Sequence, residues 1–192
     1  MEKDKIIRSA RLLVVGGSAG SIEVLLKILP DVLQKKTLTI AIVLHRKNSS
    51  DSSLPDLFAT RTKIPLKEIE DKEPLLPSAI YLAPADYHLL FEKNNSFSLD
   101  FSEKVNYSRP SIDVAFESAS DVYGADLCCL LLSGANADGV EGLRTVKKNG
   151  GQLAVQNPDT AESPFMPQRA LLKNDVDFVL NPDDMAEFIN AL

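Results

Sequence analysis

The chain has 192 residues, 44% of them hydrophobic, and a formal net charge of -6. This length provides one ordinary hydrophobic core, so we expect a single domain over 1–192, with 1–10 as an N-terminal tail. An acidic chain without a basic patch is a poor partner for nucleic acid. Its start is charged and its apolar runs are too short to insert into a membrane, so we expect a cytoplasmic protein.

The apolar runs are continuous rather than alternating, which is typical of strands covered on both faces. Amphipathic segments of helix length separate them, and the sequence therefore predicts an α/β fold, a doubly wound and mostly parallel sheet with helices on both faces. We expect strands at Arg11 to Val15, Thr39 to Leu44, Ile64 to Lys67, Asp126 to Leu132, Gly151 to Val155 and Val176 to Val179. We expect helices at Ser21 to Leu29, Ser52 to Thr60, Ser111 to Val122, Asp138 to Asn149, Pro164 to Leu171 and Pro182 to Leu192.

The middle of the chain interrupts this alternation. Short apolar runs at Ala79 to Ala83, His88 to Phe91 and Ser96 to Leu99 are separated by turn residues. Such runs are typical of hairpins. We therefore expect a small antiparallel β-hairpin insertion beside the main sheet.

The two cysteines, Cys128 and Cys129, are adjacent within a predicted strand. A disulfide between sequence neighbours is strained, and two thiols with two histidines in the whole chain do not give the usual zinc-ligand spacing. We expect both cysteines in the core, and neither a metal nor a cofactor.

The first predicted strand runs into a glycine-rich turn and then a helix. Gly16 and Gly20 bracket Ser18 as Gly-x-Ser-x-Gly, the spacing that lets the backbone turn sharply and hold a hydroxyl above a sheet edge. This is the position of a nucleophile. A phosphate-binding turn uses the same strand-to-helix junction and the same small residues, so the motif alone leaves both interpretations open.

A dinucleotide-binding site, one form of this alternative, also requires an acidic residue about 20 residues beyond the glycines. The chain instead has His45, Arg46 and Lys47 after the second predicted strand, and its glycines lack the Gly-x-Gly-x-x-Gly order. An arginine could accept the 2′-phosphate of NADP, so this alternative stays open. The lysine and hydroxyl residue of a Walker loop do not follow the glycines.

An imidazole base has two candidates, because His45 and His88 are the only histidines. His45 ends the second predicted strand and Ser18 follows the first, so neighbouring parallel strands would place both at the carboxyl edge of the sheet, where ligands bind. Asp138 follows a later strand at another turn on that edge and could orient the imidazole. The competing interpretation is that Asp138 only caps its helix.

Other acidic residues fit the role of the imidazole's partner less well. Asp113 and Asp121 fall within a predicted helix, Asp126 begins a strand at its opposite end, and Asp86 lies in the hairpin region. The sequence therefore predicts a serine, histidine and aspartate site made of Ser18 and two residues that follow later strands.

With these residues in view, the sequence resembles the catalytic domain of the chemotaxis protein-glutamate methylesterase family. The resemblance covers the chain from about Leu12 to the C-terminus. It rests on Val14 to Gly20, Val43 to His45, Ile80 to Leu90, Arg109 to Asp113, Leu132 to Gly139, Gly150-Gly151, Gln156-Asn157 and Met166-Pro167.

The resemblance implies hydrolysis of glutamyl methyl esters on the cytoplasmic helices of methylated chemoreceptors, and in some members deamidation of glutamines there. Ser18 would be the nucleophile, His45 the base and Asp138 its orienting acid. The resemblance also suggests the backbone N–H groups of Ala19 and Ala135 as oxyanion donors. It further gives His88 a supporting role, with a hairpin surface position as the alternative, and places Met166 in the wall of the cleft, with core packing as the alternative.

The chain departs from the family pattern at three turns. The family usually has a glycine at Ser21, a proline soon after the histidine where this chain has Arg46-Lys47-Asn48, and Gly-Met-Gly where it has Gly134-Ala135-Asn136. We expect a different substrate groove. These departures also suit a second hypothesis, a non-catalytic descendant that keeps the scaffold and binds a protein partner.

Family members in chemotaxis usually carry an N-terminal receiver domain, whereas about ten residues precede the first predicted strand here. This fits either a trimmed chain or a stand-alone esterase domain without phosphorylation control. We expect a monomer or a weak oligomer.

Overall fold

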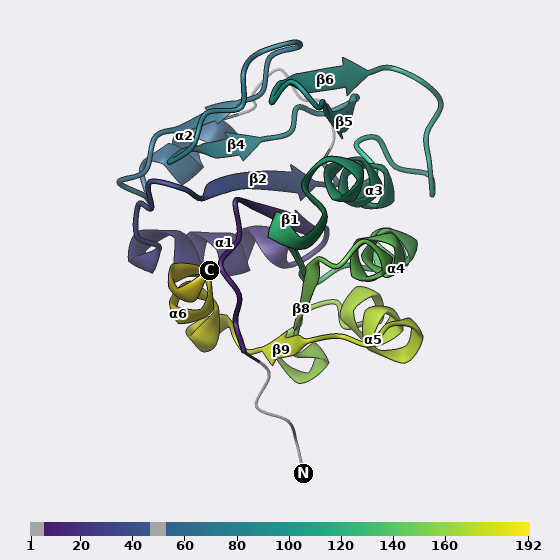
Figure 1. The fold of residues 1–192 in the computed structure, drawn as a ribbon. Coiled ribbons are helices and arrows are strands. Elements are labelled where there is room, and N and C mark those ends of the chain that lie inside the picture. Colours follow the sequence, from purple (N-terminus) through teal and green to yellow (C-terminus); the bar gives the residue numbers. More distant parts are fainter. Residues whose placement is uncertain (1–5, 47–52) are drawn as a thin grey trace.

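The structure, a computed structural model, describes residues 6–46 and 53–192. Within these residues, seven strands form one parallel sheet in the order β3-β4-β2-β1-β7-β8-β9 (Figure 1). Their bounds are β1 Leu12–Gly17, β2 Thr39–Leu44, β3 Leu66–Glu68, β4 Ile80–Leu82, β7 Leu127–Leu131, β8 Gln152–Gln156 and β9 Phe178–Leu180. The predicted parallel α/β sheet is confirmed.

Helices cover both faces of this sheet. The bounds are α1 Ser21–Ile28, α2 Leu54–Ala59, α3 Ile112–Tyr123, α4 Val140–Lys148, α5 Phe165–Lys173 and α6 Pro182–Ala191, with short 3₁₀ turns at Leu29–Asp31, Gly124–Asp126 and Pro158–Thr160. Helices α1 and α6 lie together on one face, and α3, α4 and α5 lie in a row on the other (Figure 1). Ser52, expected to open a helix, lies outside the described residues.

The sheet is buried because its central strands are apolar on both sides. Every residue of β1 and β2 is buried, and side chains that alternate along each strand supply two separate cores. Val14 belongs to the core under α3 to α5, whereas Val15 belongs to the core under α1 and α6. Cys128 and Cys129 are free thiols, fully buried, one in each core, as the sequence predicts.

Local signals set several helix ends. Ser111 caps α3, with its hydroxyl accepting a hydrogen bond from the Val114 N–H at 3.4 Å, and Pro182 opens α6. Gly150 follows α4 with a left-handed φ of 89°. Glycine adopts this conformation freely, whereas a residue with a side chain would be strained there. None of the helices in residues 6–46 and 53–192 combines the length and the apolar character that a bilayer crossing requires.

One expectation for the middle of the chain is wrong. The run at 79–83 is part of the main sheet rather than a hairpin, because β4 lies between β3 and β2 and pairs parallel with both, with Ile80 opposite Ile40 and Leu66. All three residues of β4 are buried. A short apolar run gives no periodicity that separates an internal strand from a hairpin strand. The antiparallel hairpin consists of β5 His88–Phe91 and β6 Phe97–Asp100 alone.

Strand order determines where a ligand can reach the sheet. The chain passes from β1 to β2 on one side, and β7 to β9 continue from β1 on the other side. The order therefore reverses at β1. In open α/β sheets such a reversal opens a crevice at the carboxyl ends of the strands, and ligands bind there.

Candidate active site

Ser18 occupies the turn at this reversal, between β1 and α1. Its backbone N–H donates to the Ser133 carbonyl at 2.9 Å, which ties the turn to the end of β7. Its carbonyl accepts from the N–H of Ser21 at 3.1 Å and from the Ser21 hydroxyl at 2.5 Å. Gly17 is required here, because a Cβ on it would lie 2.6 Å from the Ser21 Cβ. The turn is thus fixed on both sides, and the Ser18 side chain is half-buried.

His45 stands beside this turn on the neighbouring strand. It follows β2, and its N–H donates to the Gly17 carbonyl at 3.1 Å. On its ring, Nε2 lies 2.7 Å from Asp138 Oδ2. The other nitrogen, Nδ1, lies 3.4 Å from the Ser108 hydroxyl and 3.4 Å from the Asn136 amide nitrogen. Because the carboxylate takes the N–H of Nε2, the lone pair of the neutral ring is on Nδ1.

Asp138 is fully buried and surrounded by donors. Oδ2 accepts from the Ile112 N–H at 2.6 Å as well as from His45. Oδ1 accepts from the Ser111 hydroxyl at 2.8 Å, from the Asn106 amide at 2.9 Å and from a second N–H of α3 at 3.2 Å. Burial raises the pKa of a carboxyl group, but these hydrogen bonds outweigh burial and hold the pKa of Asp138 at about 2.

Asp138 therefore does not cap the helix that follows it. Gly139, not Asp138, is the N-cap of α4, while Asp138 accepts the first N–H groups of α3, where the helix dipole favours a negative charge. The expectation that the helix begins at Asp138 is two residues early, because α4 starts at Val140. The Asp138 side chain bonds to the start of α3 and to His45.

A second buried carboxyl group lies in the same place. Asp113, in the first turn of α3, accepts from the Gly142 N–H at 2.7 Å and from the Asn106 amide at 2.7 Å. Burial and the adjacent Asp138 charge raise the pKa of Asp113 to about 7. The sequence argument set Asp113 aside because it falls within a helix. Its place two residues after the helix cap Ser111, in the first turn of α3, is the signal that it could face the same donors as Asp138.

The predicted nucleophile and base are neighbours without being joined by a hydrogen bond. In residues 6–46 and 53–192, the Ser18 hydroxyl makes no hydrogen bond to the His45 ring, whose partners are Asp138, Ser108 and Asn136. Gly134 lies against Ser18, since a Cβ there would come within 3.1 Å of the Ser18 Cβ. Within the described ranges, no hydrogen bond fixes the rotamer of the Ser18 side chain.

A sequence profile of CheB methylesterases matches residues 13–189. The chain belongs to the CheB methylesterase family. A Leptospira interrogans protein, provisionally named protein-glutamate methylesterase/protein-glutamine glutaminase, is 43% identical over 180 residues, which cover 94% of this chain and 93% of that protein.

A Thermotoga maritima protein-glutamate methylesterase/protein-glutamine glutaminase is 30% identical over 175 residues, covering 90% of this chain. The aligned region is 51% of that protein, so the chain spans about half of its length. The crystal structure of the Thermotoga maritima CheB methylesterase catalytic domain superposes with a TM-score of 0.90 at 28% identity, over 96% of this chain and all of that one. The fold is that of a CheB catalytic domain.

In this CheB methylesterase fold, His88 is buried, so the alternative of a hairpin surface position is wrong. Nδ1 of its ring accepts from the Ser111 N–H at 3.1 Å, and Nε2 lies 2.9 Å from the Glu103 carbonyl. These partners assign the hydrogen to Nε2. His88 therefore links the loop after β6 to Ser111, whose hydroxyl bonds Asp138.

Met166 is also fully buried, in the core under α3 to α5. Its N–H donates to the Gly134 carbonyl at 2.9 Å, and a Cβ on Gly134 would lie 2.4 Å from its Cε. Met166 thus packs in the core and at the same time supports the turn beside Ser18. The burial supports core packing, and the place of Met166 in the wall of a cleft stays a prediction.

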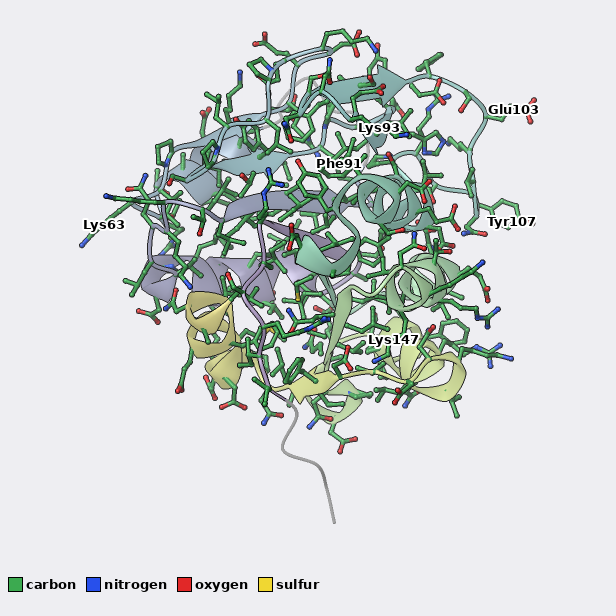
Figure 2. All side chains as sticks on the ribbon, in the orientation of Figure 1. Lys63, Phe91, Lys93, Glu103, Tyr107 and Lys147 are labelled. Carbon is green, nitrogen blue, oxygen red and sulfur yellow. The ribbon has the colours of Figure 1, made fainter. Side chains whose placement is uncertain are left out.

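A cavity of about 390 Å³ opens next to His45. It is lined by His45, Arg46, Asp86, Lys104, Tyr107, Ser108 and Arg109, so most of its wall comes from the loop that joins β6 to α3. Figure 2 shows Glu103 and Tyr107 projecting outward from this loop. At the second departure from the family pattern, Arg46 pairs with Glu68 and donates to the Ala83 carbonyl at 3.2 Å. The rest of that departure, at 47–48, lies outside the described residues.

Proposed function

We propose that the chain is a serine hydrolase that removes methyl esters from glutamyl side chains of chemoreceptors, with Ser18, His45 and Asp138 as its catalytic residues. The observation that carries this proposal is the 2.7 Å hydrogen bond between His45 Nε2 and Asp138 Oδ2, on a ring held beside the Ser18 turn. A catalytic triad has this arrangement: a buried carboxylate orients an imidazole, and the imidazole lies next to a serine, here at the edge of the sheet.

The roles follow from which atoms are already bonded. The Ser18 hydroxyl attacks the ester carbonyl while His45 Nδ1, the ring nitrogen without a hydrogen, accepts its proton. The tetrahedral intermediate then collapses, its carbon–oxygen bond to methanol breaks, and the leaving methoxy group takes the proton from Nδ1. Water, deprotonated by the same nitrogen, attacks the acyl-enzyme and releases glutamate and Ser18. With a glutamine side chain, ammonia leaves instead.

Backbone groups next to Ser18 suit the oxyanion. In the described part of the chain, the amide N–H groups of Ala19 and Ala135 donate to no protein acceptor, so both are available to a developing negative charge. Ala19 directly follows the nucleophile and Ala135 follows Gly134, which packs on Ser18. A donor of this kind contributes about 10² to 10³ in rate.

Electrostatics favour the same assignment. With its pKa held at about 2, Asp138 carries its charge throughout the neutral range and can stabilise the imidazolium that forms when His45 accepts the proton. His88 supports this group through Ser111, and Met166 supports the Gly134 turn.

We infer the substrate and the cellular location from the relatives. Two of them are named for methylesterase and glutaminase activity on proteins, which supports a protein substrate, namely the methylated helices of a chemoreceptor in the cytoplasm. We treat residues 1–192 as one catalytic domain, with the family match beginning at 13.

The test is methanol release from a methylated chemoreceptor. We expect release by the wild-type protein and almost none by Ser18→Ala. A fluorophosphonate probe gives an independent readout, since it should label Ser18 in the wild type and fail to label His45→Ala. Wild-type rates in Ser18→Ala would refute the nucleophile. A folded protein that neither labels nor releases methanol would instead support the protein-binding hypothesis.

A further inference from the structure

The loop between β6 and α3 reaches from the protein surface to the buried acids of the site. Residues 101–107 are exposed, and the Tyr107 side chain is 97% exposed. Yet Asn106, one residue earlier, extends its side chain inward to Asp113 and Asp138. Asn106 and Tyr107 both have left-handed backbone, with φ of 52° and 62°, a conformation that asparagine tolerates and tyrosine rarely adopts.

The bonding partners fix the orientation of the Asn106 side chain. Its amide nitrogen lies 2.7 Å from Asp113 Oδ2 and 2.9 Å from Asp138 Oδ1. Only the nitrogen of an asparagine amide can donate, and it carries two hydrogens. One hydrogen is therefore available for each carboxyl group.

We propose that Asn106 is a positioning residue for the His45–Asp138 pair, holding the Asp138 carboxylate toward His45 and keeping the second buried acid from displacing it. This inference rests on the proposed function, because it assigns a role within the same reaction. The Asn106 side chain is bonded to the two carboxyl groups and not to the His45 ring, whereas its carbonyl accepts from the hydroxyl of Ser108, in the cavity wall, at 3.5 Å. Its side chain acts on the imidazole through Asp138.

Asn106 differs from the other donors to Asp138. Ser111, Ile112 and Asp113 all donate from the start of α3, so the helix itself places them. Asn106 alone among these partners comes from the loop, and it alone bonds both carboxyl groups. Without it, two acids in direct contact compete for the same donors, and the Asp138 carboxylate loses one of the three bonds that fix Oδ1.

The same loop also shapes the entrance. Ser108, two residues after Asn106, lies 3.4 Å from His45 Nδ1, and Lys104 and Tyr107 line the cavity. The loop conformation that presents these side chains is the one in which Asn106 reaches the acids. Asn106 thus ties the wall of the cavity to the geometry of the base.

The test uses Asn106→Gly, because glycine adopts φ near 52° freely and the variant removes the side chain without straining the loop. Asn106→Asp, which keeps the shape and loses both donor hydrogens, is the second variant. Val105→Ala, on the same loop but outside the site, is the matched control. We expect both Asn106 variants to lower kcat for a small activated ester, p-nitrophenyl acetate, by about 10-fold to 10²-fold with KM unchanged. Val105→Ala should match the wild type.

A second measurement does not depend on turnover. The proton NMR signal of the His45 Nε2–H, which reports its bond to Asp138, should shift in the Asn106 variants and stay in place in Val105→Ala. Unchanged kcat together with an unmoved signal would overturn the positioning role, and so would a rise in KM alone. If the wild type shows no Ser18-dependent turnover, the proposed function fails, and the NMR signal still decides the role of Asn106.

Discussion

Replacing Asp113 with asparagine should change how stability depends on pH. Asp113 is 6% exposed and lies against a second buried acid. Its pKa is raised from 3.8 to about 7, chiefly by burial. The folded protein therefore binds this proton more tightly than the unfolded chain, so the wild type loses stability as pH rises from about 4 to about 7.

The size of the effect follows from the shift. One pKa unit corresponds to about 1.4 kcal/mol, so a rise from 3.8 to about 7 corresponds to about 4 kcal/mol at most. Asp138 changes stability in the opposite direction and at lower pH. Its pKa falls from 3.8 to about 2, so the stability that it contributes is present above pH 4 and is lost below it. The interval from pH 4.5 to 8 therefore separates the effect of Asp113 from that of Asp138.

Asparagine cannot repeat both of the bonds that Asp113 accepts, one from Gly142 and one from Asn106. Losing one bond costs about 1–3 kcal/mol at every pH, so the decisive quantity is the change with pH. The assay is urea unfolding of wild type and Asp113→Asn at pH 4.5 and 8, with the exposed Asp121→Asn on the same helix as control. We expect the variant to gain up to about 3 kcal/mol relative to wild type over this interval, because the part of the shift between pH 3.8 and 4.5 lies below it. Parallel pH curves would refute the reasoning.

Three further outcomes are expected. Asp138→Asn should lower turnover by about 10² to 10⁴ because the imidazole loses its orienting charge, with far-UV circular dichroism checking that the fold is kept. Gly134→Ala should slow fluorophosphonate labelling of Ser18 about tenfold or more, because the new Cβ would lie 2.4 Å from the Met166 Cε and 3.1 Å from the Ser18 Cβ; unaltered labelling would show that the turn has room. Cys128 and Cys129 should react with a thiol reagent only on unfolding, since both are fully buried and burial raises their pKa values; reaction at the rate of a free thiol in the folded protein would contradict this.

Much of the site could be predicted because its parts are local. The end of β1 is a buried run that breaks into glycines around Ser18, and the end of β2 is a buried run that stops at His45. Parallel pairing of these strands, with Gly17 opposite Leu44, brings the two ends together. Ser18, Ala19, Ala135 and the remaining assigned roles stay predictions until the variants are measured.

Other parts depend on partners far along the chain. Asp138 looked like a helix cap in the sequence, but Asn106 and the start of α3 bind its carboxylate. A hairpin position left a surface location open for His88, but the loop after β6 contacts its ring and the residue is buried. These contacts join residues far apart in the sequence, and the residues next to them along the chain do not indicate the contacts.

The sequence by itself determined the alternation of buried strands and amphipathic helices, and the three turns that carry Ser18, His45 and Asp138. Only the tertiary structure decided that β4 enters the main sheet, that Asp113 joins Asp138 in a buried pair, and that Asn106 lies between them. The reason is physical. Strand and turn propensities act over a few neighbouring residues, whereas burial and hydrogen bonding of a side chain depend on which distant elements pack around it.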